Sequence, residues 1–279
     1  MRFSRLSLAL ACAIAPLIGT AQTAAPTGEF KGSGWSHSPE TQALAVAQAD
    51  VVLPARSTGA GVFTGKFKDL PSLAGSRVPV VLFLHGSSGL GLKAIGEWQQ
   101  WLATLGFASV APDSFALPDH VTYKSPIEKA QYERIHALRA SEIGPMLTAL
   151  KSQGWADPAQ LILAGTSEGA VAVARYPGTD FAARLVYSWS CESNYFVQAP
   201  QNAFEPGKPV LNIISSTDPF FSPANPWLGN TQAAGHCSAA LKDVARASIV
   251  LIPGAPHTLL NLPEARDATS GFLASLAKR

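Results

Sequence analysis

One stretch constrains the fold of this chain more than any other. Residues 161–174 begin as an apolar, strand-like segment and end as a helix-like segment, and the two meet at Gly165-Thr-Ser167-Glu-Gly169. A strand that turns directly into a helix brings two backbones together, and glycine permits such contact because it has no side chain. The pattern predicts a sharp strand-to-helix turn from which Ser167 projects clear of the backbone. An ordinary glycine-rich turn without a chemical role is the alternative.

The rest of the chain alternates between strand-like and helix-like segments. This alternation predicts a single α/β domain, in which a mostly parallel central sheet is covered by helices on both faces. Besides the strand before Ser167, apolar patterns predict strands over residues 44–54, 61–67, 78–84, 107–111, 185–189, 209–215 and 247–252. Helical patterns cover residues 94–105, 125–151, 168–175 and 264–278.

The predicted helix over 125–151 carries its own start and break signals. Ser125, Pro126 and Glu128 match an N-cap, a first-turn proline and an N3 glutamate. Pro145 follows Gly144 in the interior, where proline removes a backbone donor. We therefore expect a helix that begins after Ser125 and is kinked or split near Pro145.

Four loops that follow predicted strands carry residues suited to nucleophilic catalysis. They hold His85-Gly86, Ser167, Asp218 and His257. In a parallel sheet such loops meet beyond the carboxyl ends of the strands. A serine needs a base to take its proton, and that histidine needs a carboxylate to orient it, so we expect Ser167, His257 and Asp218 to act in these roles. Alternatively, Asp218 is a turn-forming residue before proline, and His257 is a structural histidine.

The loop over residues 85–89 is the predicted oxyanion hole. Free backbone N–H groups must converge there, and we expect those of Ser87 and Glu168, with Ser88 as the second choice after Ser87. His85 is expected to orient the loop. The Glu168 side chain is expected to have a capping role, in which its negative charge stabilises the N-terminus of the helix that begins there. A plain strand-to-helix turn would also explain residues 85–89.

Taken together, these motifs resemble the α/β-hydrolases, and among them the dienelactone hydrolase-like group of single-domain enzymes. The resemblance covers residue 44 to the C-terminus, without a large lid, and its carriers are residues 80–86, 112–115, 165–170, Asp218 and Pro256-His257. The enzymes that name the group use cysteine where this chain has Ser167. The resemblance implies a serine hydrolase that cleaves carboxylic esters through an acyl-enzyme, without a cofactor. A peptidase, an acyltransferase or a catalytically silent binding protein of the same fold are the alternatives.

The N-terminus has the pattern of a secretory signal peptide. Arg2 and Arg5 precede an apolar run over residues 6–18 and small residues at 19–21. We expect residues 1–21 to be removed on export to the periplasm or the extracellular space, residues 22–43 to form a loose leader, and residues 44–279 to fold. A lipid anchor at Cys12 is the alternative. No other stretch has the length of apolar sequence that a membrane helix needs.

The net charge of the chain limits the kinds of binding partner that we expect. The formal net charge of +2 falls to 0 once Arg2 and Arg5 are removed. A neutral chain gives no electrostatic reason to bind nucleic acid or an anionic membrane. The expected partner is a small-molecule ester. The six histidines are scattered and lack metal-ligand spacing, so no metal site is expected.

Two cysteines, Cys191 and Cys237, remain after the predicted signal peptide. An exported chain folds under oxidising conditions, which predicts a disulfide between them. Two separate buried thiols are the alternative. Aromatic residues on the predicted edge loops are candidates for a substrate pocket or for ordinary loop packing: Phe115, Tyr195, Phe196, Phe220, Phe221 and Trp227.

Overall fold

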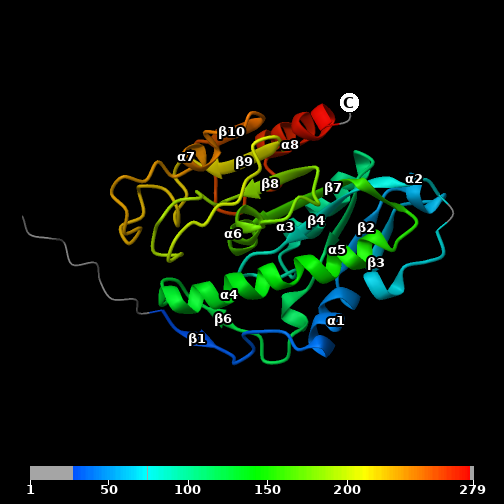
Figure 1. Ribbon diagram of the computed structural model, residues 1–279, viewed down its shortest axis with the longest axis horizontal. Coiled ribbons are helices and arrows are strands. Elements are labelled where there is room, and N and C mark those ends of the chain that lie inside the picture. The colour runs from blue at the N-terminus through cyan, green and yellow to red at the C-terminus, as the bar shows by residue number, and fades with distance from the viewer. Residues whose placement is uncertain (1–27, 74, 277–279) are drawn as a thin grey trace, which may run out of the picture.

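The computed structural model describes residues 28–73 and 75–276, so the predicted signal peptide and Cys12 lie outside the described residues. One central sheet has the strand order β10-β9-β8-β7-β4-β5-β2-β3 (Figure 1). The run from β10 to β5 is parallel, whereas β2 and β3 pair antiparallel at one edge. The strands are β2 (Asp50–Leu53), β3 (Phe63–Lys66), β4 (Val78–Leu84), β5 (Ala108–Ala111), β7 (Ala156–Thr166), β8 (Ala183–Tyr187), β9 (Val210–Ser215) and β10 (Ala247–Ile252).

Helices cover both faces of this sheet, which confirms the predicted α/β class. Side chains of β4 alternate between two apolar cores: Leu82 and Leu84 face the helices α4 to α6, while Val81 and Phe83 face α3 and α8. The helices are α1 (Pro39–Ala47), α2 (Ala55–Thr58), α3 (Lys93–Thr104), α4 (Lys129–Ser141), α5 (Ile143–Lys151), α6 (Glu168–Arg175), α7 (Ser238–Leu241) and α8 (Pro263–Leu276), with 3-10 turns at Phe67–Asp69 and Ser114–Ala116.

The N-terminal part of the described chain differs from the prediction. Residues 28–43, expected as part of a loose leader, contain β1 (Phe30–Lys31), which pairs with β6 (Thr122–Tyr123), and the start of α1. The strand predicted over 44–54 is also wrong in its first half, because α1 continues to Ala47 and β2 begins only at Asp50. A capping box at Ser38 and Thr41 stabilises the first turn of this helix.

The helix predicted over 125–151 is split, as expected, but it starts later. Ser125 is not the N-cap, because α4 begins only at Lys129; its hydroxyl accepts a hydrogen bond from the Tyr132 hydroxyl at 2.8 Å instead. Glu128 is the N-cap of α4 instead. The break between α4 and α5 falls at Glu142, just before the Gly144-Pro145 pair.

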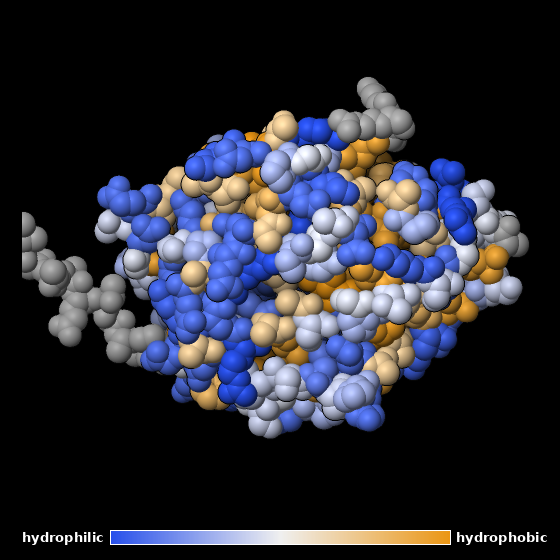
Figure 2. Space-filling view, viewed as in Figure 1, coloured by the Kyte–Doolittle hydropathy of each residue, from blue (hydrophilic) through white to orange (hydrophobic). Residues whose placement is uncertain are grey.

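On the face seen in Figure 2, hydrophilic residues are concentrated over the end of the molecule where α4 begins. Apolar residues reach the surface mainly toward α5 and β2. Within the described residues, none of the helices has the length and apolar character that a bilayer crossing demands.

The two glycines that flank Ser167 allow strand β7, helix α6 and strand β4 to pack closely. A Cβ atom on Gly165 would lie 2.6 Å from the Gly169 carbonyl group, and one on Gly169 would lie 2.0 Å from the Leu84 carbonyl oxygen. Real Cβ contacts are not this short, and the obstructing atoms are backbone.

We therefore expect Gly169→Ala to lower the free energy of unfolding by about 3 kcal/mol or more, because overpacking a rigid core forces the backbone to move. Urea unfolding measures this. Gly144→Ala is the matched control, since a Cβ on Gly144 meets no atom within 4 Å. An unchanged stability in Gly169→Ala would contradict the packing described here.

Candidate active site

Ser167 occupies the sharp turn between β7 and α6. Its backbone has φ of 55° and ψ of −118°, a conformation that non-glycine residues rarely adopt. Its N–H donates to the Tyr187 carbonyl oxygen at 3.1 Å, and its own carbonyl oxygen accepts from the Val171 N–H at 3.2 Å. Backbone strain of this kind is concentrated at functional sites, because the surrounding structure must hold it in place. Ser167 therefore lies where the sequence pattern predicts a strained turn.

His257 and Asp218, from the loops after β10 and β9, are joined by a hydrogen bond. The Nδ1 atom of His257 lies 2.8 Å from Oδ2 of the fully buried Asp218. The other carboxylate oxygen, Oδ1, accepts from the backbone N–H groups of Phe220 at 2.9 Å and Phe221 at 3.1 Å. Because a carboxylate only accepts, Nδ1 donates to Asp218, and this tautomer leaves Nε2 as the acceptor atom of the ring.

A single cavity of about 320 Å³ brings Ser167 together with His257 and Ser87. The structure does not contain a hydrogen bond between the Ser167 hydroxyl and the His257 ring. In unliganded serine enzymes this contact is often long and tightens when substrate binds. The three loops carrying Ser167, Asp218 and His257 thus meet at one edge of the sheet.

The loop over residues 85–89 approaches Ser167 from the carboxyl end of β4. A Cβ on Gly86 would lie 3.1 Å from the Ser167 Cβ, so glycine permits this approach. The Nδ1 atom of His85 contacts the Gly86 carbonyl oxygen at 2.7 Å, and Nε2 accepts from the Ser114 N–H at 3.2 Å. Burial, reinforced by the Arg139 charge, holds the pKa of His85 well below its usual value, so the ring is neutral.

These bonds connect His85 to the loop, as the predicted orienting role requires. In a trans peptide group the C=O and N–H bonds point in opposite directions. The Gly86 C=O and the Ser87 N–H belong to one such peptide group. Because His85 holds the carbonyl oxygen on one side of this group, the Ser87 N–H points to the other side. Ser87 lines both the 320 Å³ cavity and a smaller adjoining one of about 30 Å³, whereas Ser88 lines only the smaller.

Glu168 is the first residue of α6, so its carboxyl group lies in the first turn of the helix as expected, but its hydrogen bonds go to other elements. Its fully buried carboxylate accepts a hydrogen bond from the Tyr123 hydroxyl through Oε1 and from the Arg139 guanidinium, at 3.1 Å, through Oε2. Burial raises the pKa of Glu168, and the positive charge of Arg139 opposes that shift. The first residue of α6, which directly follows Ser167, is thereby fixed to α4 and to β6.

Tyr123 and Arg139 escaped prediction as site residues. Arg139 lies within the helix predicted over 125–151, where no motif marks it, and it is buried beside the turn at Ser167. Tyr123 belongs to β6, a two-residue strand that carries no sequence signal of its own because it depends on pairing with β1. Of the predicted pocket aromatics, Phe115 and Trp227 lie outside the cavity wall, and Tyr195, Phe196, Phe220 and Phe221 belong to it.

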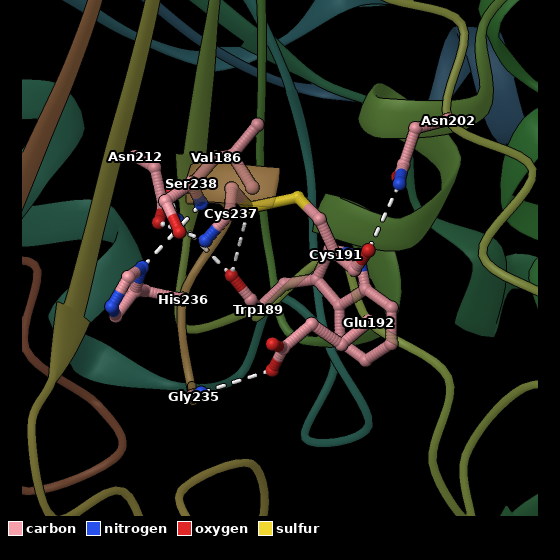
Figure 3. Close-up of a disulfide and its surroundings, with 10 residues drawn as sticks. All are labelled: Val186, Trp189, Cys191, Glu192, Asn202, Asn212, Gly235, His236, Cys237 and Ser238. Carbon is pink, nitrogen blue, oxygen red and sulfur yellow. Dashed lines mark hydrogen bonds between the residues drawn. A yellow bond between two sulfur atoms is a disulfide. The ribbon is translucent and has the colours of Figure 1, made fainter. Parts of the chain in front are cut away.

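The predicted disulfide joins Cys191 to Cys237, which are 46 positions apart (Figure 3). It links the segment after β8 to the segment before α7. Beside it, the Asn212 side chain of β9 donates to the Trp189 carbonyl oxygen at 3.0 Å and accepts from the Cys237 N–H at 3.1 Å. Both linked segments are therefore also tied to the sheet.

We expect the double variant Cys191→Ala/Cys237→Ala to lose about 4 kcal/mol of unfolding free energy, since a cross-link across 46 positions restricts the unfolded chain by about that amount. Denaturant unfolding with and without a reducing agent measures it. The wild type should lose stability on reduction and the variant should not. Equal stability of the two oxidised proteins would be the contrary result.

Two other features of the described residues bear on the site. The described residues contain no group of three or more His, Cys, Asp or Glu side chains arranged to hold a metal ion. A larger hollow, of about 870 Å³, lies between α3 and the β2–β3 edge and is lined by residues such as Val62, Gln100 and Trp101. Its lining contains no serine, cysteine or histidine, whereas the smaller cavity contains both Ser167 and His257.

The order of the sheet strands and the turn at Ser167 define the α/β-hydrolase fold. No protein-family model matches the sequence, and no curated protein matches it. Solved structures do match.

Esterase PE8 has a TM-score of 0.51 and 22% identity, over 74% of this chain and 96% of its own. A protein assigned as a dienelactone hydrolase from Klebsiella pneumoniae has a TM-score of 0.52 and 16% identity, over 83% and 99%. Est1E from Butyrivibrio proteoclasticus, solved with ferulic acid, has a TM-score of 0.53 and 15% identity, over 83% and 95%. Identities this low show that the fold is shared.

Proposed function

We propose that this protein is a serine hydrolase that cleaves small carboxylic esters through an acyl-enzyme on Ser167. The observation that carries the proposal is the 2.8 Å bond between His257 Nδ1 and the buried Asp218 carboxylate, beside a cavity that also contains Ser167. This bond presents His257 Nε2 as a base for the serine hydroxyl. The named activities of the structural neighbours agree with ester hydrolysis.

The mechanism follows from these positions. His257 takes the proton of Ser167 as the serine oxygen attacks the ester carbonyl, and Asp218 stabilises the resulting imidazolium. The backbone N–H groups of Ser87 and Glu168 donate to the negative carbonyl oxygen. Each such donor contributes about 3 kcal/mol in comparable sites. His257 then protonates the leaving alcohol, and water activated by the same ring releases the acid.

Hydrolysis is favoured over two of the three alternatives, acyl transfer and silent binding. Ser87 and Lys124 on the cavity wall are exposed, so water reaches the site, whereas acyl transfer requires water to be excluded. A silent binding protein would have no need of a buried aspartate oriented toward His257. A peptidase remains distinguishable by its activity on an amide analogue of an ester that is cleaved.

We also propose that the protein is exported. Two features support export: the signal-peptide pattern of residues 1–21, and the disulfide, since such bonds persist in oxidising compartments. Cell fractionation tests this. Recovery of a shortened chain from the periplasm or medium is expected, and an uncleaved chain in the cytoplasm would contradict export.

Labelling with a fluorophosphonate probe tests the enzymatic proposal. Wild type should be labelled at Ser167, as located by peptide mass spectrometry, and should hydrolyse p-nitrophenyl acetate. Ser167→Ala should lose both properties. Ser216→Ala, which changes an exposed serine after β9, is the matched control and should keep them. A folded wild type that is neither labelled nor active would overturn the proposal.

A further inference from the structure

Aromatic side chains form half of the wall of the 320 Å³ cavity. They are Tyr123, Tyr195, Phe196, Phe220 and Phe221, out of ten lining residues. They come from three separate segments: β6, the loop after β8 and the loop after β9. The adjoining cavity of about 30 Å³ shares Ser87, Ser167 and His257 with the larger cavity and has only enough room for a very small group. The two cavities that meet at Ser167 therefore differ strongly in size and chemistry.

Four of the five rings, Tyr195, Phe196, Phe221 and Phe220, form one connected cluster that begins at the catalytic base, and Tyr123 joins it through Tyr132. Phe220 lies 4.7 Å from the His257 ring, at an interplanar angle of 67°. Behind it, Phe221 and Phe196 are 5.2 Å apart and inclined at 61°. Edge-to-face and offset arrangements are those that aromatic rings prefer, because the edge is positive and the face negative. A ring entering this cavity can make the same contacts.

This wall is held in place before any substrate binds. Phe196 and Phe221 are almost fully buried, and Trp189 packs against Phe221 with ring centroids 4.9 Å apart. Figure 3 shows Trp189 beside the Cys191–Cys237 disulfide. In addition, the Asp218 carboxylate accepts the backbone N–H groups of Phe220 and Phe221. A preformed wall selects by shape, since little free energy is lost in ordering it.

The volume suits one ring with a short linker. A cavity of about 150 Å³ holds a benzene ring, and drug-sized ligands occupy about 300 Å³ or more. We propose that the aromatic cavity selects esters that carry one planar aromatic ring close to the ester bond, on the side of the ester that enters this cavity. The proposal rests on the ester hydrolase function above and names its substrate class.

Matched pairs of esters test the selectivity with the intact protein. Methyl 3-phenylpropanoate is compared with methyl 3-cyclohexylpropanoate, which places the ring on the acid side. Then 2-phenylethyl acetate is compared with 2-cyclohexylethyl acetate, which places it on the alcohol side. In one of these two comparisons, kcat/KM should be at least about tenfold higher for the phenyl ester than for the cyclohexyl ester, because a planar ring gains contacts that a puckered ring cannot make. The comparison that shows the preference identifies which half of the ester enters the cavity.

Phe220→Leu tests whether the wall is the cause. Phe220 is only half-buried, so its replacement should leave the fold intact. The substitution should lower the ratio of kcat/KM for the phenyl ester to kcat/KM for the cyclohexyl ester several-fold. A disturbance of His257 alone would instead lower kcat/KM equally for both esters. Phe67→Leu is the matched control: this half-buried ring lies outside the cavity, and the ratio should stay that of wild type.

The proposal would be overturned if kcat/KM for the phenyl and cyclohexyl esters differed by less than twofold in both comparisons. It would also be overturned if Phe220→Leu kept the wild-type ratio. These outcomes differ from failure of the hydrolase function itself. In that case none of the four esters would be cleaved and the fluorophosphonate probe would not label Ser167.

Discussion

Replacement of Asp218 by asparagine is expected to lower kcat for p-nitrophenyl acetate about 10⁴-fold while the protein stays folded. The asparagine carbonyl oxygen can still accept the N–H groups of Phe220 and Phe221, as Oδ1 does now. Its NH₂ group then faces His257 Nδ1 and donates to it. The ring is left with its proton on Nε2, where it cannot accept the proton of Ser167.

The measurement is kcat together with the thermal unfolding midpoint. Asp113→Asn is the matched control, because Asp113 follows β5 at the same edge and accepts the Phe115 N–H at 3.0 Å without contacting a histidine. It should change kcat by only a few-fold. If Asp218→Asn kept a tenth or more of the wild-type kcat, the role of the carboxylate would have to be abandoned.

The second large effect concerns the buried ion pair beside Ser167. Arg139→Met is expected to lower the free energy of unfolding at pH 8 by about 3–5 kcal/mol, since it leaves the buried Glu168 carboxylate without its cation. The double variant Arg139→Met/Glu168→Gln should recover much of this loss, because the amide is neutral and can still accept from Tyr123. Lys151→Met removes a pair that is exposed, with Asp180, and should cost about 1 kcal/mol or less.

The loss in Arg139→Met should depend on pH with a definite sign. Burial already raises the pKa of Glu168, and removing Arg139 removes the main opposing influence, so the folded-state pKa rises further above that of the unfolded chain. A carboxyl group of this kind contributes full stability below the unfolded value, about 4.3, and loses it as pH rises through the folded value.

Urea unfolding at pH 5 and pH 8 measures the difference. Arg139→Met should be closer to wild type at pH 5. The double variant, which lacks the carboxyl group, should show no such dependence beyond that of the remaining groups. A destabilisation that is equal at both pH values would argue that lost packing, rather than the unpaired charge, is responsible.

The sequence predicted well those features that depend on local pattern. Continuous apolar runs predicted the buried parallel strands, and β10 has the same limits as the predicted strand over 247–252. Strand alternation also placed the loops of Ser167, Asp218 and His257 at one edge, because in parallel sheets the loops after strands meet there. The error at residues 44–54 has a local cause: an alanine-rich apolar run suits a helix or a strand, and the Ser38 cap decides for a helix.

Features that depend on distant contacts could not be predicted in this way. The burial and pairing of Glu168 were missed because its partners, Arg139 and Tyr123, lie 29 and 45 positions away. Neither partner follows a predicted sheet strand. A charge at the start of a helix resembles a capping residue in sequence, and only the tertiary structure shows that it is buried and paired.

The cross-link between Cys191 and Cys237 has a practical meaning for anyone preparing this protein. It anchors the segment that carries Trp189, against which the aromatic wall packs. Material produced in a reducing host would lack the bond and would hold that wall less firmly. Two batches with one sequence could therefore differ in substrate preference, so the thiol content of each batch should be titrated before their kinetics are compared.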